Sequence, residues 1–303
     1  MAKNKVLIVG SIAFDSIKTH KASAKNVLGG SASYSSIASS FFAPTKLVAT
    51  VGKDFTQKHI AIFKKRGVDL ESLEIKEGKT FTWSASYDKD FKNATTLSTK
   101  LNVFSDFYPK IQPQDIDTEV VFLANIAPSL QLEVLKQLKK PRLIACDTMN
   151  LWIHNNKPEL LKLLKKVHIL FVNEAEARQL SGSYNLIEAG RKILKMGPQI
   201  AVIKLGPNGA LLVSKDCLCQ IPPYLVEYPK DTTGAGDSFG GGFVGYLASV
   251  KNWQDLKHIK RALAMGSVVA SFAIESFSVS KLASVNREII NKRLKEYLNA
   301  SKI

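Results

Sequence analysis

The chain has 303 residues, of which 45% are hydrophobic and 22% charged, and this balance excludes a disordered or fibrous protein. Its 42 lysines and arginines outnumber its 26 aspartates and glutamates, so the formal net charge is +16. The basic residues are spread along the chain in short clusters such as residues 64–66, with no basic tail. The sequence therefore indicates a basic globular protein and does not predict a nucleic-acid partner.

The N-terminal segment MAKNKVLIVGSIAFDS predicts a first strand, because no small-residue cleavage site follows its short apolar run. No apolar run approaches the roughly 20 residues that a membrane-spanning helix needs. The three cysteines, Cys146, Cys217 and Cys219, form no paired framework, which is typical of a reducing compartment. We therefore expect a cytoplasmic protein with no membrane partner.

Short apolar runs that are typical of buried strands recur at residues 5–10, 45–51, 120–124, 142–146, 168–172 and 199–204. Helix-like segments are predicted at residues 31–42, 54–66, 159–166, 174–180, 187–196, 234–249, 255–272 and 285–298. Apolar strands that alternate with helices indicate an α/β fold with a doubly wound, mostly parallel sheet and helices on both faces.

Residues 78–103 interrupt this alternation, because polar and apolar residues alternate there and Thr, Ser and aromatic residues are frequent. This pattern is typical of half-buried antiparallel strands. We expect a single domain, residues 1–303, with a small β-strand lid from about residues 12–28 and 78–105. The alternative is an edge extension of the sheet that has no part in ligand binding.

A glycine-rich segment, DTTGAGDSF, opens the helix predicted at residues 234–249. Backbone amides at a helix N-terminus without bulky side chains form a site for an anion such as a phosphoryl group. Asp237 lies in the first turn, where its carboxylate would repel a phosphate unless it has a chemical role. Accepting a proton from an attacking hydroxyl is such a role. A capping role alone leaves the glycines before Asp237, and those at 240–242 after it, unexplained.

The whole chain resembles the ribokinase family of PfkB-type carbohydrate and nucleoside kinases, because residues 231–239 are similar to the family's C-terminal signature. The resemblance implies a kinase that uses ATP and Mg²⁺. It implies that Asp237 is the catalytic base, beside an anion hole formed by Gly234, Ala235, Gly236 and Asp237. In many relatives the residues that match Asp231 and Thr233 hold a monovalent cation, so a K⁺ site is expected there.

Two further segments resemble the family's ATP site, and each directly follows a predicted strand. Asn173-Glu174-Ala175-Glu176 is similar to the family's Asn-x-x-Glu motif, which implies that Glu176 arranges Mg²⁺ through water and that Asn173 lies near the phosphates. The segment KLGPNG stands where relatives carry a glycine-rich loop bordering ATP. Its candidates for ATP binding are Lys204, Gly206 and Gly209, although these glycines also predict an ordinary turn.

The acceptor is expected in the N-terminal half. Asp15 comes just after the first strand, at the edge where open α/β sheets bind ligands, and relatives use an aspartate there to hold sugar hydroxyls. Gly29 and Gly30 resemble the family's first signature, which lets a sugar approach the backbone. Asn150 ends a turn, DTMN, that resembles the family's Asp-Pro-Asn turn and faces acceptor or phosphate.

The sequence departs from the family at two acceptor positions. Tyr34 stands where the family commonly has an asparagine, and Ala13 stands where many sugar kinases carry a polar residue. A site that has lost polar groups and gained an aromatic ring favours an acceptor with an attached base. Four other aromatic residues add to such a face or belong to the core: Phe14, Trp83, Phe104 and Phe107.

Together these features predict an ATP-dependent phosphotransferase that phosphorylates a hydroxyl of a small sugar. A nucleoside kinase acting on an adenosine- or inosine-like acceptor is the alternative. A second alternative is a regulatory protein of the same fold that binds ligands without turnover, although a binder gains little from the Asp237 carboxylate. Lid strands in this family sometimes form a dimer contact, so a homodimer through the lid is expected as one assembly.

Overall fold

The computed structural model describes residues 5–89 and 94–300. A ten-stranded sheet has the order β14-β13-β12-β11-β10-β9-β1-β4-β5, with β6 paired to β4. Its strands are β1 (Val6–Val9), β4 (Thr45–Gly52), β5 (Val68–Asp69), β6 (Leu73–Lys76), β9 (Val120–Leu123), β10 (Leu143–Asp147), β11 (Ile169–Asn173), β12 (Ile200–Lys204), β13 (Ala210–Ser214) and β14 (Leu218–Ile221). All pairs are parallel except β12–β13 and β13–β14, which form an antiparallel edge.

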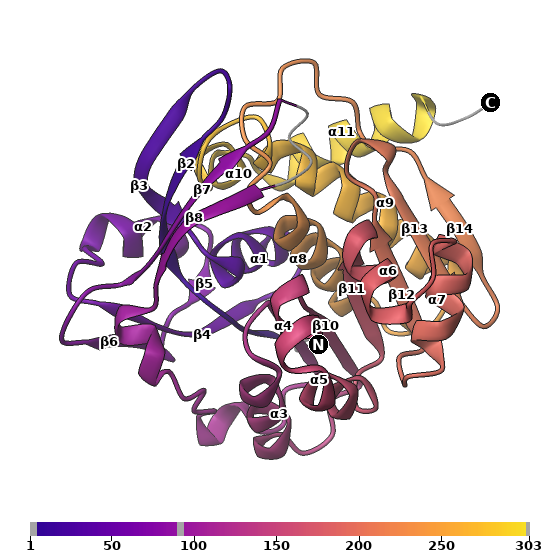
Figure 1. The fold of residues 1–303 in the computed structure, drawn as a ribbon, viewed down its shortest axis with the longest axis horizontal. Helices are drawn as coiled ribbons and strands as arrows, with labels where there is room; N and C mark the ends of the chain where they lie inside the picture. The colour runs from indigo at the N-terminus through magenta and orange to yellow at the C-terminus, as the bar shows by residue number, and fades with distance from the viewer. Residues whose placement is uncertain (1–4, 90–93, 301–303) are drawn as a thin grey trace.

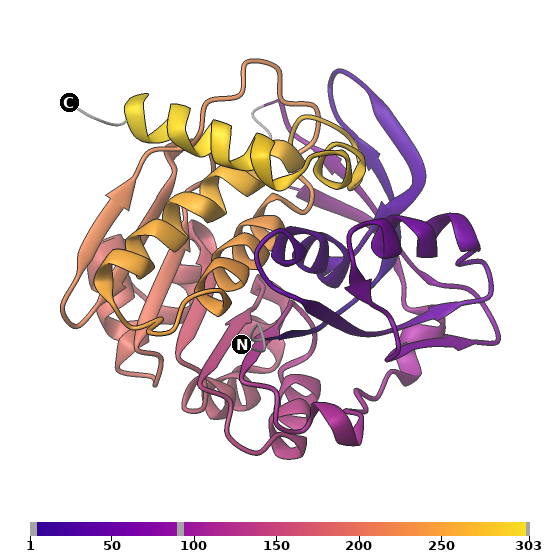
Figure 2. The ribbon, with the colours of Figure 1, turned by 180° about the vertical axis from the view of Figure 1, so that it is seen from behind.

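Helices cover both faces of this sheet. The front layer in Figure 1 contains α3 (Pro128–Gln137), α4 (Asn150–Asn155), α5 (Lys157–Leu164), α6 (Glu174–Ser181) and α7 (Leu186–Leu194). Figure 2 shows the opposite face, with α1 (Ser31–Ser40), α8 (Ala235–Ala248), α9 (Leu256–Ala273) and α11 (Arg287–Ala300). The chain also contains α2 (Gln57–Lys65), α10 (Ser280–Ser284) and the 3₁₀ turns η1 (Asn102–Asp106), η2 (Pro113–Asp115) and η3 (Gly206–Asn208).

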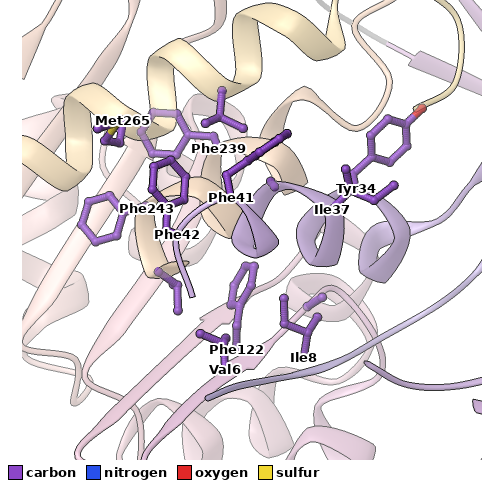
Figure 3. Close-up of a cluster of buried hydrophobic side chains, with 14 of the residues drawn as sticks. Val6, Ile8, Tyr34, Ile37, Phe41, Phe42, Phe122, Phe239, Phe243 and Met265 are labelled. Carbon is purple, nitrogen blue, oxygen red and sulfur yellow. The ribbon is translucent and has the colours of Figure 1, made fainter. Parts of the chain in front are cut away.

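The apolar sequence of strand β1 explains why this strand lies in the middle of the large sheet. All four side chains are fully buried, and successive side chains point to opposite faces. Val6 and Ile8 join the core beneath α1 and α8, whereas Leu7 and Val9 join the core beneath α3 to α7. Figure 3 shows Ile8 and Phe122 pointing from the sheet towards α1. A strand buried on both faces needs a continuous apolar run, as its sequence has.

A second sheet of four strands lies beside this domain core, in the order β3-β2-β7-β8. Its strands are β2 (Ala13–Lys18), β3 (Ser23–Gly29), β7 (Phe81–Tyr87) and β8 (Ala94–Lys100). Strands β2 and β7 pair in parallel, and β3 and β8 pair with them antiparallel. The antiparallel character predicted for residues 78–103 is present in the β7–β8 pair, and the positions 90–93 of that segment lie outside the described residues.

The predicted α/β fold is confirmed, and each of the six predicted apolar runs overlaps a strand of the large sheet. Helices α3, α4 and α10 and strands β5, β6 and β13 were not predicted. Across residues 5–89 and 94–300, no helix combines the length and the apolar character that crossing a membrane requires.

Candidate active site

Polar side chains end three adjacent strands of the large sheet. Asp147 is the last residue of β10, Asn173 of β11 and Lys204 of β12, and the last two are register partners. The carboxyl ends of parallel strands meet at one edge of the sheet, where open α/β folds bind ligands. The sequence pattern of an apolar run followed by a polar residue therefore places these groups together.

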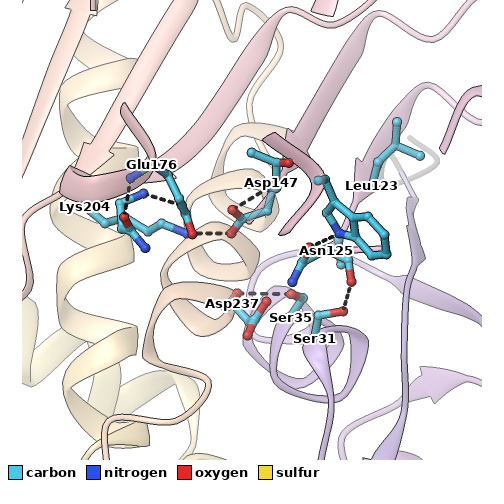
Figure 4. Close-up of polar contacts among 12 residues, drawn as sticks. Ser31, Ser35, Leu123, Asn125, Asp147, Glu176, Lys204 and Asp237 are labelled. Carbon is cyan, nitrogen blue, oxygen red and sulfur yellow. Dashed lines mark hydrogen bonds and ion pairs between the residues drawn. The ribbon is translucent and has the colours of Figure 1, made fainter. Parts of the chain in front are cut away.

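Lys204 and Asp147 form a nearly buried ion pair at this edge, with Nζ 2.7 Å from Oδ2 (Figure 4). Their side chains are 17% and 3% exposed. The Lys204 ammonium also lies against Gly236, because a Cβ built at Gly236 would stand 3.1 Å from Nζ. Burial lowers the pKa of Lys204, but nearby carboxylates outweigh burial and raise that pKa, so the ammonium stays charged.

The N-terminus of α8 lies beside this pair. Gly234 is the N-cap, with a left-handed φ of 73°, and a Cβ there would overlap the ring of Tyr34. The Ala235 amide donates to Thr232 O at 3.2 Å. The amides of Gly236 and Asp237 belong to the first turn, where no carbonyl of the helix precedes them as acceptor. These amides and the Lys204 ammonium can meet an anion together.

Asp237 sits in this first turn and keeps partial contact with solvent. Its backbone carbonyl accepts a hydrogen bond from Ser35 Oγ at 3.1 Å, which ties α8 to α1. Burial raises the pKa of Asp237 to about 7, the charge of Asp147 adds to this shift and Lys204 opposes it. A carboxylate with a pKa near neutrality is suited to take a proton at physiological pH.

The glycines at 240–242 have a packing role. A Cβ at Gly240 would meet the Phe122 ring at 2.6 Å, and one at Gly242 would meet Val269 at 3.0 Å. Gly241 lies directly against the Ser35 carbonyl of α1. These three residues let α8 approach its neighbours closely. Close helix packing therefore accounts for these glycines, which the sequence argument left unexplained.

Glu176 lies close to the Lys204–Asp147 pair, at the start of α6. Asn173 and Glu176 form a capping box, in which Glu176 Oε2 accepts from the Asn173 amide at 2.7 Å and Asn173 Oδ1 accepts from the Glu176 amide at 2.8 Å. Burial raises the pKa of Glu176 to about 7, and Lys204 opposes this shift. Within residues 5–89 and 94–300 its other oxygen, Oε1, has no hydrogen bond to the protein and could accept one from a water or bind an ion.

The loop before α8 contains a second buried carboxylate. Asp231 is 1% exposed, and its Oδ1 accepts from the Thr233 amide at 2.9 Å and from Thr233 Oγ1 at 2.7 Å. Its Oδ2 is buried and has no hydrogen-bond partner within the described residues. Thr233 Oγ1 is also hydrogen-bonded to the Tyr87 hydroxyl of β7 at 3.1 Å, so the small sheet contacts this loop.

Asp15, Gly29 and Gly30 meet at the base of the small sheet. The Asp15 side chain is 3% exposed and packs so closely on Gly29 that a Cβ there would overlap its carboxylate. Gly30 has a φ of 90°, a conformation that favours glycine. Burial raises the pKa of Asp15 to about 8, and the charges of Asp231 and Asp237 add to this shift. The acceptor carboxylate predicted from sequence therefore lies near Asp237.

Tyr34 is 2% exposed and lies near the carboxylates of Asp15 and Asp237. Its ring packs on Gly234. Burial raises its pKa, and the charges of Asp15, Asp231 and Asp237 add to the shift. Tyr34 thus fills space next to the anion hole.

The remaining predicted residues lie further from this cluster. Asn150 is exposed, and its Oδ1 accepts from the Leu151 amide at 2.9 Å. Gly206 and Gly209 have positive φ values of 56° and 88° and form the turn η3 after Lys204. The turn expected from these glycines is present, and it adjoins the end of β12.

Sequence reasoning missed three polar residues of the site. Asp147 was noted only as part of the turn before Asn150, yet it holds Lys204. Gln131 Nε2 donates to the carbonyls of Leu123, Ala124 and Asp147 at 3.0–3.1 Å and so joins the ends of β9 and β10. Tyr87 contacts the loop before α8. Only Asp147, a polar residue that ends an apolar run, carried a sequence signal.

Comparisons with known proteins agree with this geometry. Residues 3–285 match the sequence profile described as pfkB family carbohydrate kinase. A cytidine kinase of Thermococcus kodakarensis is 26% identical over 79% of this chain and 87% of its own length. A nucleoside kinase of Methanocaldococcus jannaschii is 24% identical over 84% of this chain and 81% of its own length. A structure of Arabidopsis thaliana ribokinase with ribose and ATP covers 97% of this chain and 99% of its own, at 22% identity and a TM-score of 0.77. The chain belongs to the pfkB family of carbohydrate kinases, which confirms the resemblance read from the sequence and the predicted class of enzyme, an ATP-dependent sugar or nucleoside kinase.

Proposed function

We propose that Asp237 is the general base of this kinase and that it takes the proton of the acceptor hydroxyl. One observation carries the proposal: the Asp237 carboxyl lies in the same helical turn as the backbone amides at the start of α8, beside the Lys204 ammonium. A hydroxyl that Asp237 deprotonates would therefore face a phosphoryl group held by these amides. Asp15, with Gly29 and Gly30, would orient the acceptor from the other side.

Lys204 and the carboxylates around it suit the phosphates of ATP and a bound Mg²⁺. Lys204 would neutralise the charge that develops on the transferred group, and Asp147 would keep its ammonium in place. Glu176 Oε1 fits a magnesium ion held through water, because hard oxygen ligands suit that ion. A magnesium ion held there would supply positive charge that lowers the repulsion between the phosphates and the acceptor oxygen. Gly206 and Gly209 would border the nucleotide at the end of β12.

Asp231 Oδ2 supports a monovalent cation site in the loop before α8. A buried carboxylate oxygen without a partner in the described residues is costly unless a cation meets it. Thr233 lies beside it and would contribute backbone or hydroxyl oxygen. A cation there would hold the loop that precedes the anion hole, so K⁺ would act on the order of this loop and not on the acceptor.

The test is the Asp237→Asn variant, assayed by ADP release with ATP and Mg²⁺ against sugars and nucleosides. We expect turnover to fall by roughly 10²- to 10⁴-fold, the usual contribution of a general base, while ATP binding persists. Because Gly234 is the N-cap, a purely structural role of Asp237 would be that of a negative charge in the first helical turn, worth about 0.3–1 kcal/mol, and its loss would leave activity intact. Near-normal turnover of this variant would therefore contradict the assignment of Asp237 as the general base.

Two broader proposals concern the setting of the enzyme. The small sheet would act as a lid over the acceptor in a single domain, and its outer strand β8, exposed along its whole length, supports a homodimer formed through this sheet. Sedimentation analysis would measure the assembly. The three cysteines are all free, which supports a location in the cytoplasm.

A further inference from the structure

One face of the small sheet is turned towards the site. In β7, residues 83, 85 and 87 share a face because side chains alternate along a strand. Tyr87 reaches Thr233, so this face looks at the loop before α8. Strand β2 pairs with β7 in continuous parallel register, with Asp15 beside Trp83 and Ile17 beside Ala85. Trp83 therefore lies on the inward face, one strand away from the acceptor carboxylate.

The structure separates Trp83 from the other aromatic candidates. Phe14 points to the opposite face of β2, where its ring packs on Phe55 and His59 at 6.1 and 4.9 Å between centroids. The Phe104 ring stacks on Phe81 at 5.7 Å and on Phe107 at 5.1 Å. These three rings belong to packed clusters. Trp83 alone of the four combines partial exposure with a place beside Asp15.

The indole of Trp83 is held in a defined orientation. Its Nε1 donates to Thr96 Oγ1 of β8 at 3.2 Å. This bond satisfies the polar edge of the ring on the neighbouring strand and leaves the ring faces for contact. A fixed aromatic plane is a platform on which a flat group can stack, and stacking of this kind accepts any base.

At the positions of Ala13 and Tyr34, the proposed acceptor site lacks polar side chains that would hydrogen-bond a free sugar. Ala13 offers no polar side chain, and the Tyr34 ring occupies the space beside Gly234. The strongly buried Asp15 carboxylate remains, and it suits two adjacent hydroxyls. Neighbouring strands lie about 4.8 Å apart. A molecule with a diol on Asp15 would therefore bring a substituent of its sugar ring to Trp83 on the next strand.

Building on the proposed function, we infer that the acceptor is a nucleoside, a ribose joined to a planar base. Asp15 binds the ribose diol, the 5′-hydroxyl points to Asp237, and the base stacks on Trp83. The inference rests on the register of β2 and β7, which puts the carboxylate and the indole side by side on the inward face. Trp83 then determines specificity and takes no part in the chemistry.

The test measures kcat and KM for cytidine, adenosine, ribose and fructose in the wild type and in Trp83→Ala, Trp83→Phe and Ser84→Ala. Ser84 lies next to Trp83 on the opposite face of β7, so its variant controls for disturbance of the strand. We expect nucleosides to be preferred. Trp83→Ala should raise the nucleoside KM roughly tenfold to a hundredfold, the worth of one base stack. The ribose KM, the Trp83→Phe variant and the Ser84→Ala variant should change little.

Nucleoside binding is also followed by tryptophan fluorescence without any turnover. The chain has three tryptophans, so Trp83→Phe leaves two as the control for the signal of Trp83. We expect nucleosides, and not ribose, to change the emission of the wild type and to leave that of Trp83→Phe unchanged.

Each outcome separates the inference from the proposed function. If ribose or fructose is turned over with a kcat/KM equal to that of the nucleosides, the chain is a kinase and the inference is wrong. An equal rise in KM for ribose and nucleosides in Trp83→Ala makes Trp83 a structural residue of the sheet and also overturns it. If no acceptor is phosphorylated but nucleosides change Trp83 emission, the inference stands and the proposed catalysis fails. If no acceptor is phosphorylated and no nucleoside changes the Trp83 emission, both the inference and the proposed function are contradicted.

Discussion

Lys204 is the cation on which the charges of the site depend. Its ammonium faces the start of α8, and its pKa is raised by Asp147, Glu176 and Asp237. In turn it opposes the rise in the pKa values of Glu176 and Asp237. Without Lys204, the anion hole would face these carboxylates alone. The lysine would thus allow the proposed general base, Asp237, and a phosphoryl group to lie next to each other at this edge of the sheet.

Removing this charge gives a test at the level of one residue. We expect Lys204→Met to lower kcat/KM for ATP by about 10²- to 10³-fold, the range measured when one preorganised electrostatic contact is removed. The acidic limb of the pH profile should also move to higher pH, because Lys204 holds down the pKa of Asp237. Steady-state kinetics at several pH values measures both effects. Lys195→Met, at an exposed position, is the control, and a loss of activity in both variants would contradict a specific role.

The pH dependence of the wild type is a separate prediction. Burial raises the pKa of Asp237 to about 7, and a general base works only when it is deprotonated. We expect kcat/KM to rise with pH and to level off above neutrality. Burial raises the pKa of Glu176 to about 7 as well, so both carboxyls titrate over the same range of the pH profile. A rate that stays constant between about pH 5.5 and 8.5 would contradict a base of this kind.

At the scale of elements, the close packing of α1 on α8 places the residues proposed to hold the acceptor next to those proposed to hold the phosphoryl group. Helix α1 is rich in serine and alanine, and α8 presents glycine at the contact, so the two backbones approach closely. Ser35 Oγ then reaches Asp237 O, and the Tyr34 ring reaches Gly234. The two helices thus hold the first signature, Gly29 and Gly30, next to the C-terminal signature at residues 231–239.

This packing predicts that replacing a glycine of α8 by alanine lowers the stability of the fold, which is opposite to the usual effect of this substitution in a helix. An alanine within a helix is ordinarily more stable than a glycine by about 1 kcal/mol. At Gly241 the new Cβ would collide with the Ser35 carbonyl, a backbone group that cannot move aside, and would stand 2.9 Å from Ala38 Cβ. We expect Gly241→Ala to destabilise the fold by about 1–3 kcal/mol in urea unfolding.

Gly266→Ala in α9 is the matched control for this substitution. Its Cβ would meet only atoms of the Phe239 ring at 3.0 Å, and a side chain can shift. Its cost should be clearly smaller than that of Gly241→Ala. Equal stabilities of the two variants would show that the α1–α8 contact yields more easily than its geometry indicates.

At the scale of the whole molecule, the buried carboxyl groups of the site lower the stability of the folded protein when they are ionised. Burial raises the pKa of Asp15 to about 8 and the pKa values of Glu176 and Asp237 to about 7. In the unfolded chain these carboxyls ionise near pH 4. The folded state therefore binds protons more tightly, and the stability from protonation is present at low pH and lost as pH rises towards 8.

We expect the melting temperature of the ligand-free protein to fall between about pH 6 and pH 8.5. Asp15→Asn removes one titrating group, so it should melt higher than the wild type at pH 8.5, by about 2–5 °C. The difference should shrink towards pH 6. Differential scanning calorimetry at both pH values measures it. A variant that melts lower than the wild type at pH 8.5 would mean that the ionised Asp15 carboxylate is well satisfied in the fold.

The sequence by itself determined the class of fold and the positions of Asp237, Asp15, Glu176 and Lys204. Strands buried on both faces require apolar runs, and a phosphate site at a helix N-terminus requires small residues. Both demands are local and leave a pattern along the chain. Helices α3 and α4 were missed because they are short and their apolar residues follow no clear period, whereas β13 has the same continuous apolar run as the predicted strands and could have been predicted.

Only the tertiary structure decided which residues act on one another. The Lys204–Asp147 pair joins positions 57 apart in the chain, and the Thr233–Tyr87 bond joins positions 146 apart. The sequence could not show that Gly240, Gly241 and Gly242 serve helix packing, because a glycine looks the same in a phosphate loop and in a close helix contact. Nor could it sort Trp83 from Phe14, since the face on which a strand residue lies depends on the pairing of β2 with β7. Contacts between distant segments depend on register and packing, and these are properties of the folded chain.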